Sequence, residues 1–525
     1  MRAMSRPFGH RTLRSATLEL VWLVPIAAIG AIYFSPRHLV SPETAVTGLV
    51  AAIVVLAAAR RPDLSLLGLI ALFPFQGLVL AALWTMGLPA SVVSHLGAWK
   101  ETLALGVVLA GVRSLLATRR RLDAVDRLAL GFVALVGLYA LMGPSIVPGA
   151  PSAPKILLLG FREMAAFVLI LFGARHASLG PRFAGRAANT VLVVGAIVGA
   201  VGIFEAIFSS TWNHFVVHTI KYPAYQMFVL HSRPMNPYDI RFYGFVGGLR
   251  IVRIGSVFLS YLFCSWYLVI PWAVGLERAV RRRASPFVVL TTVLVGGALL
   301  LTQTRSALLG ALVVAFLALQ PAAGRGRHWR TQAAIVLVAL AVLAIPAAIA
   351  TGVSKRVESA GNQHDVSTAG HIAGFSDGVD TMRSHPLGLG LGTGVGTGQR
   401  FRVRHDVVAE NNYLEVGDEL GIPAMLVFAA LTIALLLRLR RASREYSDPL
   451  ITAAWTAGAG LAVAAWFLQT WSSFAVAWTY WGIAGAMLAV ARQRATVPAP
   501  AAPETSASLR SYEPAPQLAA SSASR

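Results

Sequence analysis

The chain has 525 residues, of which 56% are hydrophobic and 13% are charged, and its mean hydropathy is +0.65. Soluble domains carry about 25% charged residues, so this composition excludes an ordinary soluble protein and indicates a membrane protein. The formal net charge of +22 does not indicate nucleic-acid binding, because the arginines fall in short clusters between apolar runs. The single cysteine, Cys264, lies in an apolar run and offers neither a disulfide nor a thiolate metal site.

Apolar runs follow one another from the basic N-terminus to about residue 494. The first run shows no small-residue cleavage site, so we expect an uncleaved span there and not a removed signal peptide. Since a membrane-spanning helix needs about 20 mostly apolar residues, the chain is predicted to be an all-α polytopic membrane protein with about 14 transmembrane helices. The predicted spans are 17–35, 42–59, 64–86, 99–117, 128–144, 156–174, 189–209, 253–276, 286–304, 306–320, 332–352, 412–437, 449–470 and 473–491.

The charges between these spans predict the orientation of the chain. The N-terminus and every second connection carry clusters of arginine, such as residues 119–121 and 281–283, whereas the short connections on the other side carry almost none. The positive-inside rule therefore places both termini in the cytoplasm. Residues 1–494 form the predicted membrane domain, and the Ala-, Pro- and Ser-rich tail 495–525 is predicted to be disordered.

Two connections on the predicted outer side, residues 210–252 and 353–410, are far longer than the others. Long loops are usually functional when they are ordered. The first loop interleaves aromatic residues with lysine and arginine, a mixture that suits sugar rings and phosphates. The same mixture is equally typical of an aromatic belt at a membrane interface, so both interpretations stay open.

The second loop contains a predicted amphipathic helix, because Ile372, Phe375, Val379 and Met382 recur at spacings of three and four residues. We expect this helix to lie on the membrane surface or to cap a cavity. In the segment that follows, residues 388–394, glycines alternate with other residues as in a phosphate-binding loop. Without a strand, turn and helix around it, close approach of the backbone is the better explanation of this pattern.

Histidines gather in the two long loops, but their spacing matches no metal-binding motif. His214 and His218 stand one helical turn apart, and no third ligand accompanies them. The sequence therefore predicts neither a metal site nor a cofactor.

Arg305 separates two apolar runs too tightly for a free loop, on the predicted outer side. An arginine at membrane depth costs at least about 2.5–3.5 kcal/mol on insertion scales and normally faces a cavity or a partner. The competing interpretation is an arginine that snorkels at a helix end. Arg253 opens another predicted span on the same side, and two guanidinium groups at this depth suit a bidentate anion site.

Lys100, Arg162 and Glu205 lie inside predicted spans. Adjacent residues of a helix do not face each other, so we expect Lys100 and Arg162 to pair with residues other than the glutamates that follow them. For all three residues, structural pairing between helices is favoured over catalysis.

Four motifs occur in a fixed order along the chain: an arginine before Gly-Ser-Val-Phe at 253–258, Thr-Gln-Thr-Arg-Ser at 302–306, His-Pro-Leu-Gly-Leu-Gly-Leu-Gly at 385–392, and Asn-Asn-Tyr-Leu at 411–414. The last motif runs into Glu-Leu-Gly-Ile-Pro-Ala-Met-Leu at 419–426. Together, over about residues 190–440, these motifs resemble the O-antigen ligase and O-antigen polymerase superfamily.

The resemblance implies a GT-C-like membrane fold and a metal-independent, inverting glycosyltransferase. Such an enzyme moves a glycan from polyprenyl (undecaprenyl) diphosphate to an acceptor hydroxyl at the outer face of the bacterial inner membrane. It also implies that Arg253 and Arg305 bind the diphosphate. A histidine often helps to activate the acceptor at the position that Glu410 takes here, so the base is Glu410, or His385 or His371 supplies the function, or the good leaving group makes a base unnecessary. Further candidates for substrate binding are Lys100, Arg162, Asn411, Asn412, Tyr413 and His371.

The acceptor decides between a polymerase, a ligase and a protein-directed oligosaccharyltransferase, and the sequence leaves this choice open. A transporter or flippase with the same number of spans is the alternative from another class. Transporters often contain repeated halves. The sequence shows no such repeat, and its two large loops lie on one predicted side, which favours an enzyme.

Overall fold

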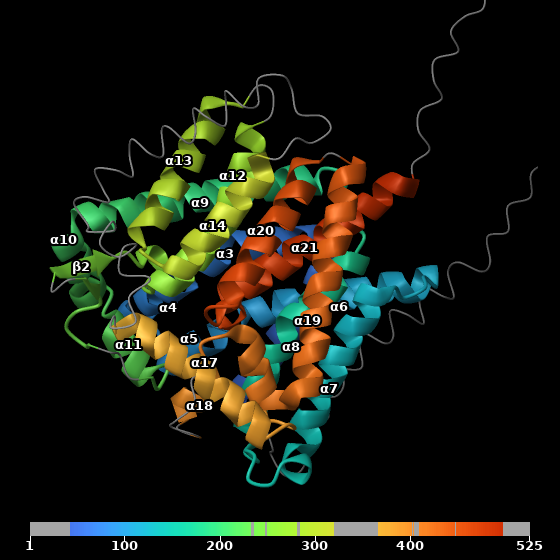
Figure 1. Ribbon diagram of the computed structural model, residues 1–525, viewed down its shortest axis with the longest axis horizontal. Helices are drawn as coiled ribbons and strands as arrows, with labels where there is room; N and C mark the ends of the chain where they lie inside the picture. The colour runs from blue at the N-terminus through green and yellow to red at the C-terminus, as the bar shows by residue number, and fades with distance from the viewer. Residues whose placement is uncertain are drawn as a thin grey trace, which may run out of the picture.

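The computed structural model in Figure 1 describes residues 42–232, 236–246, 249–280, 284–319, 366–401, 403, 409–446 and 448–496. The predicted spans 17–35 and 332–352, and the tail beyond residue 496, lie outside the described residues. The described chain is helical except for its connections and one two-stranded antiparallel hairpin. The mostly helical fold predicted from the sequence is thereby confirmed.

The first half of the described chain contains the helices α2 (Pro42–Arg60), α3 (Pro62–Leu72), η1 (Phe73–Phe75), α4 (Gln76–Thr85), α5 (Ala90–Leu96), α6 (Trp99–Thr118), α7 (Ala124–Ile146), α8 (Pro154–His176) and α9 (Phe183–Ile207). The first long loop follows. It contains α10 (Ser209–His214), the π-helical turn η2 (Phe215–Thr219), α11 (Tyr222–Phe228) and the hairpin of β1 (Phe242–Val246) and β2 (Leu249–Arg253).

The second half contains η3 (Ser256–Phe258), α12 (Tyr261–Ala279), α13 (Pro286–Leu301) and α14 (Arg305–Leu319). The second long loop contributes α17 (Val366–Ser384) and α18 (Val395–Phe401), which lie toward the lower left in Figure 1. The chain then continues through α19 (Asn412–Tyr446), α20 (Pro449–Ala465), η5 (Thr470–Ser472) and α21 (Phe474–Thr496).

Within the described residues, 7 helical segments are long and apolar enough to cross a membrane. Shorter apolar helices accompany them at Thr47–Arg60, Pro286–Leu301, Arg305–Leu319 and Pro449–Ala465. The predicted amphipathic helix of the second loop is also present as α17. Its Met382 is buried against α19, whereas Ile372 and Phe375 in its first ten residues are exposed.

Arg253 does not begin a helix, contrary to the span predicted over 253–276. It ends strand β2, and helix α12 begins only at Tyr261. Between them, Ser256 and Leu259 adopt positive φ angles of 49° and 53°, which are incompatible with an α-helix. The prediction was wrong because an apolar composition does not reveal such a turn.

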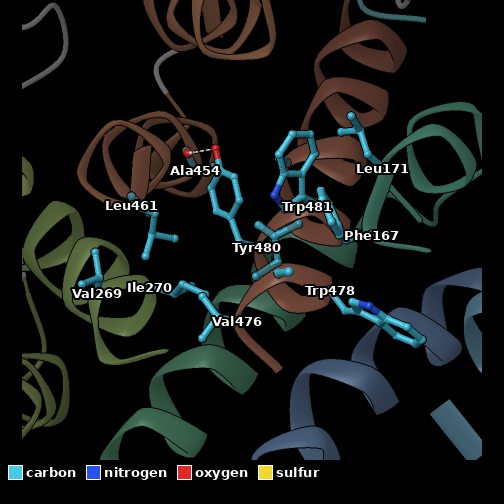
Figure 2. Packing of buried hydrophobic residues seen from close by; sticks show 14 of the residues in the cluster. Phe167, Leu171, Val269, Ile270, Ala454, Leu461, Val476, Trp478, Tyr480 and Trp481 are labelled. Atoms are coloured by element: carbon cyan, nitrogen blue, oxygen red, sulfur yellow. Dashed lines mark hydrogen bonds between the residues drawn. The ribbon is translucent and has the colours of Figure 1, made fainter. Parts of the chain in front are cut away.

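Helices α12 and α21 form the centre of the bundle. Nearly every residue of α12 from Cys264 onward is buried, because α9, α13, α14, α20 and α21 surround it. Figure 2 shows Tyr480 and Trp481 of α21 among side chains of neighbouring helices. The Trp481 ring centroid lies 5.1 Å from that of Phe167, and Tyr480 Oη donates a hydrogen bond to Ala454 O at 3.3 Å, so the buried hydroxyl is satisfied.

Small residues bring α14 and α20 into close contact. A Cβ added to Gly310 would lie 2.6 Å from Gly460 O, closer than real Cβ atoms come to any neighbour. Membrane helices that approach in this way gain packing and dispersion energy without a hydrophobic driving force. The pair therefore fixes the first turns of α14 relative to the last turns of α20.

A charge cluster, buried except for Asp123, joins the start of α7 to the end of α8. Arg175 Nη1 donates to Asp126 Oδ1 at 2.9 Å and also pairs with Asp123, while His176 Nε2 lies 2.9 Å from the same Asp126 oxygen. Burial works to raise the pKa of Asp123, but the hydrogen bond and charge of Arg175 outweigh it and lower this pKa to about 2. The cluster thus connects the start of α7 to the end of α8, two helix ends that were both predicted to lie on the cytoplasmic side.

Two further contacts also join helix ends that were predicted to lie on the cytoplasmic side. Arg278 Nη1 at the end of α12 donates to Asn189 Oδ1 in α9 at 2.6 Å, and Arg494 Nη2 in α21 donates to Asp448 Oδ2 before α20 at 2.6 Å. Each contact joins segments predicted to lie on one side of the membrane. Within the described chain, the helix directions are therefore consistent with the predicted alternation.

Candidate active site

Arg253 is hydrogen-bonded to the turn that connects α13 to α14. Its Nε donates to Thr302 O at 3.1 Å, and its Nη2 donates to Gln303 O at 3.3 Å and to Thr304 Oγ1 at 3.2 Å. Residue Arg305 follows directly as the first residue of α14. The structure thus brings the two predicted arginines, 52 positions apart by their numbers, to a single turn.

The turn of residues 302–304 and strand β2 donate hydrogen bonds to each other. Gln303, at a positive φ of 54°, donates from Nε2 to Val252 O at 3.0 Å. The Cζ atom of Arg253 lies 3.4 Å from the ring centroid of Tyr261, a cation–π arrangement. A guanidinium group fixed by three acceptors and an aromatic ring has little freedom, so Arg253 presents its charge in one orientation.

Within the described chain, the hydrogen-bond partners of Glu205 are backbone N–H groups and not basic side chains. Its Oε2 accepts hydrogen bonds from the backbone N–H groups of Gly255 and Ser256, just after Arg253. A structural role between segments, as favoured from the sequence, agrees with this contact.

Glu410 lies between two residues that are bound to the connection of α20 and α21. Gln469 Nε2 donates to Ala409 O, and Asn411 Nδ2 donates to Trp466 O at 2.8 Å. Asn411 Oδ1 also accepts from the backbone N–H groups of Tyr413 at 2.8 Å and Leu414 at 3.1 Å, so Asn411 caps α19. The backbone of Glu410 is thereby held in place.

The other residues of the Asn-Asn-Tyr motif strengthen the same junction. Asn412 Oδ1 accepts from Trp471 N at 2.5 Å, and its Nδ2 donates to Glu415 Oε2 at 3.2 Å. Ser472 Oγ donates to the same Glu415 oxygen at 2.7 Å. The ring of Tyr413 packs near Trp466, with centroids 6.0 Å apart. These side-chain contacts within the chain favour a supporting role for the motif.

Arg305 and Glu410 belong to the same end of the bundle. Arg305 begins α14, whose Gly310 packs against Gly460 near the end of α20. Trp466 follows α20 and holds Asn411, the neighbour of Glu410. The expectation that Arg253, Arg305 and the end of the second loop share one side of the protein therefore agrees with the described contacts.

The alternating glycines after α17 pack tightly, as we expected from their pattern. Gly388, Gly390 and Gly392 have positive φ angles of 77°, 101° and 86°. A Cβ on Gly388 would lie 2.6 Å from the backbone nitrogen of Gly421, and one on Gly392 would lie 2.6 Å from Ile156 Cγ2. Close backbone approach is therefore confirmed, and side chains are excluded at these positions.

Three buried glutamates that we did not single out from the sequence surround the start of α18. Glu419 Oε2 accepts from Gly392 N at 2.7 Å, and Glu163 Oε2 accepts from Thr397 Oγ1 at 2.9 Å. A Cβ on Gly394 would meet Glu419 and lie 3.4 Å from Glu415 Oε1. The four-residue spacing of Glu415 and Glu419 near the start of an apolar helix was the available signal. Among the described residues, no group of three His, Cys, Asp or Glu side chains could hold a metal ion.

A group of basic residues lies between α6, α8 and α18. Arg162 Nη1 donates to Glu101 Oε1 at 3.2 Å, a pairing between helices, as predicted. Lys100 Nζ lies 3.4 Å from the same oxygen, so for Lys100 the expectation that adjacent residues do not meet was wrong. Helix α18 packs against α8, and burial together with the charge of Arg162 lowers the pKa of Arg400 in α18. The Glu101 carboxylate thus pairs with two cations, Lys100 and Arg162.

The two candidate histidines lie in α17 and at its end. His371 is inside the helix. His385 is exposed, and its Nδ1 lies 2.9 Å from Ser384 Oγ. Gly378, between them, has its Cβ position 3.3 Å from Ala409 Cβ, so the middle of α17 lies next to the residue before Glu410.

The fold and this site define a multi-pass helical membrane protein with a polar, arginine-containing site at one end of its bundle. Residues 290–429 match the family described as O-antigen ligase. The match confirms the resemblance to the O-antigen ligase and polymerase superfamily. It contains Arg305, the glycine segment and Glu410, whereas Arg253 and Glu205 precede it. A search of curated proteins gave no match.

Proposed function

We propose that this protein is a membrane glycosyltransferase that transfers an oligosaccharide or polysaccharide from a polyprenyl diphosphate carrier to a sugar hydroxyl. The reaction takes place at the outer face of the bacterial inner membrane, with both termini in the cytoplasm. The observation that carries the proposal is the turn of Thr302 to Thr304, which binds Arg253 and leads into Arg305. The match to O-antigen ligase over residues 290–429 supports the reaction class.

The donor diphosphate binds beside Arg253 and Arg305. Planar guanidinium groups bind phosphate oxygens through two parallel hydrogen bonds, and they keep their charge at every physiological pH. Negative charge grows on the leaving oxygen as the bond between sugar and phosphate breaks. Fixed positive groups therefore stabilise the transition state more than the bound donor, which is the requirement for catalysis.

The acceptor hydroxyl attacks the anomeric carbon opposite the diphosphate. A new bond forms between the acceptor oxygen and this carbon, and the carbon–oxygen bond to the diphosphate breaks with its electron pair. The proton of the hydroxyl passes to a base, and polyprenyl diphosphate leaves. Attack from the opposite side inverts the anomeric configuration.

Glu410 is the first choice for the base, because both flanking residues are anchored to the connection of α20 and α21. A carboxylate with a fixed backbone can be presented to a substrate without a further ordering step. His385 is the alternative; it is exposed at the end of α17 and lies next to Ser384 Oγ. His371, inside α17, is the third candidate.

Lys100 and Arg162 contribute a second positive region that favours an anionic group of the substrate. They share one carboxylate, Glu101, and Arg400 adds a further cation nearby. Asn411, Asn412 and Tyr413 support the loop end that carries Glu410.

Reconstitution tests the proposal. Purified protein in proteoliposomes receives its lipid-linked donor, isolated from the strain that carries the gene, together with the matching acceptor. We expect a new glycosidic bond of inverted configuration in the product and release of polyprenyl diphosphate. Arg305→Ala should lower the transfer rate by about 100-fold or more, the scale of loss for a group that stabilises transition-state charge.

Membrane insertion and accumulation of Arg305→Ala are the control for folding. Normal transfer by this variant would contradict the proposal. Movement of labelled donor across the bilayer without any new glycosidic bond would favour a flippase instead.

A further inference from the structure

Glu205 is a buried carboxylate in α9 that the reaction described above does not use. Its side chain lies in the core with 2% of its surface exposed. Its Oε2 accepts two backbone hydrogen bonds, from Gly255 N at 2.9 Å and from Ser256 N at 2.6 Å. A carboxylate costs free energy to bury unless hydrogen bonds compensate it, so its position has a structural purpose.

The segment that Glu205 binds is fastened to α9 at two further points. Ser256 adopts a positive φ of 49° and donates from Oγ to Val198 O at 2.7 Å. Gly202 of the same helix leaves room for Ile254, because a Cβ at this glycine would lie 2.8 Å from Ile254 Cδ1. A non-glycine residue at positive φ is strained and persists only where its surroundings hold it. The two hydrogen bonds that Glu205 accepts from this segment stabilise the strained conformation.

The fastened segment is continuous with the arginine site. Ile254 N donates to Leu301 O at 3.5 Å, and Gln303 Nε2 donates to Val252 O at 3.0 Å. Arg253 lies between these two contacts and donates to the turn of α13 and α14. An unbroken path of contacts therefore leads from Glu205 through the backbone of residues 254–256 to Arg253.

We infer that Glu205 is a positioning residue for Arg253: its carboxylate holds the backbone after Arg253 and thereby sets the place of the guanidinium group in the donor site. The inference rests on the proposed function. Removal of the acceptor leaves two buried N–H groups without a partner, and the strained turn relaxes to satisfy them. Arg253 then moves relative to the turn that leads into Arg305. A small displacement of a group that stabilises the transition state lowers the rate strongly.

The test compares three variants of Glu205 in the reconstituted transfer assay. Glu205→Gln keeps an oxygen in place that can accept both N–H groups, and its transfer rate should stay within about threefold of the wild type. Glu205→Ala removes the acceptor, and Glu205→Asp withdraws it by one methylene. Both should lower the rate by about tenfold or more, the loss that unsatisfied buried N–H groups produce.

A double-mutant cycle with Arg253→Ala separates positioning from general damage to the fold. If Glu205 acts through Arg253, then adding Glu205→Ala to the Arg253→Ala variant should change its transfer rate by less than about twofold. The matched control is Asn189→Ala, which removes the contact with Arg278 at the opposite end of α9. Its effect, whatever its size, should multiply with that of Arg253→Ala. Where Glu205→Ala does not accumulate in membranes, Glu205→Asp takes its place in the cycle.

The inference would be overturned if the rate losses of Glu205→Ala and Arg253→Ala multiply in the double variant. It would also be overturned if Glu205→Gln lowers the transfer rate as much as Glu205→Ala does. In both cases a strong loss in Arg253→Ala alone leaves the proposed function intact. Normal transfer by Arg253→Ala would overturn the inference together with the role proposed for this arginine in donor binding.

Discussion

Arg253 Nη2 donates a hydrogen bond to Thr304 Oγ1 at 3.2 Å, and Thr304 is the residue directly before Arg305. One arginine thus orders the turn that presents the other. The three hydrogen bonds of Arg253 therefore fix the backbone from which Arg305 extends. Guanidinium groups held in this way suit an anionic ligand such as a diphosphate.

Thr304→Val should weaken transfer without unfolding the protein. Valine has nearly the same shape as threonine but offers Arg253 no acceptor oxygen. We expect a decrease of about tenfold in the transfer rate at low donor concentration, since hydrogen bonds to charged groups contribute about 1.5–3 kcal/mol. The control is Thr432→Val in α19, where the hydroxyl donates only to Phe428 O of its own helix among the hydrogen bonds described. Equal activity of the two variants would contradict the role of Thr304.

Glu410→Gln tests the base. If Glu410 accepts the proton of the acceptor hydroxyl, the variant should lose about 100-fold or more in the maximal transfer rate, because general bases contribute factors of about 10²–10⁴. The concentration of donor that gives half the maximal rate should change little. His385→Ala is the matched variant, and we expect it to retain most activity. The reverse result, a large loss in His385→Ala alone, would assign the base to the histidine.

Gly310→Ala should destabilise the protein through the contact of α14 and α20. The new Cβ would lie 2.6 Å from Gly460 O, so one helix must shift. We expect a loss of about 1–3 kcal/mol, seen as a lower midpoint of thermal unfolding in detergent. Gly297→Ala is the control, because a Cβ there meets nothing within 4 Å. Alanine in an open helical position is neutral or stabilising. Equal midpoints for the two variants would contradict the packing described for Gly310.

Asp123→Asn should change the pH dependence of stability. The pKa of Asp123 lies at about 2 instead of its ordinary 3.8, so the ionised carboxylate stabilises the folded state above the ordinary value. This contribution is lost as the pH falls through about 2. Asparagine can still accept the hydrogen bonds from Val125 N and Asp126 N that cap α7, so the variant keeps the cap and removes the charge together with the hydrogen bond from Arg175.

In this comparison, the wild type should unfold at a higher temperature than Asp123→Asn near neutral pH. The difference should shrink as the pH falls below 3.8 toward 2. We expect a modest difference, because the carboxylate is 40% exposed and water screens its pairing with Arg175. A difference that is the same at every pH would show that the charge of Asp123 does not contribute.

The arginine pair could be predicted because it depends on features that a sequence carries directly. Arg305 between two apolar runs, and Arg253 at the edge of another, are visible as costly charges. The alternation of arginine clusters then assigns both to one side. The alternating glycines at 388–392 likewise predict a close approach of backbones there, and the positive φ angles of these glycines agree with this prediction.

The support of the site could not be predicted in the same way. Glu205 accepts hydrogen bonds from backbone N–H groups 50 and 51 positions away. Such a contact follows no periodicity, and because every residue except proline has a backbone N–H group, the partner cannot be recognised by its residue type. The helix predicted from Arg253 begins only at Tyr261 for a similar reason, since the turn that separates them is stabilised by these distant contacts. Contacts between a side chain and a distant backbone depend on the tertiary arrangement, which composition and spacing do not record.

The most direct test of the account is the affinity of the purified protein for undecaprenyl diphosphate compared with undecaprenyl monophosphate. The lipid chain is the same in both, so the difference reports recognition of the second phosphate. We expect the wild type to bind the diphosphate at least about tenfold more tightly, and Arg305→Ala to lose this preference while it still binds the lipid. Equal preference for the diphosphate in the wild type and in Arg305→Ala would contradict the claim that this turn is the donor site.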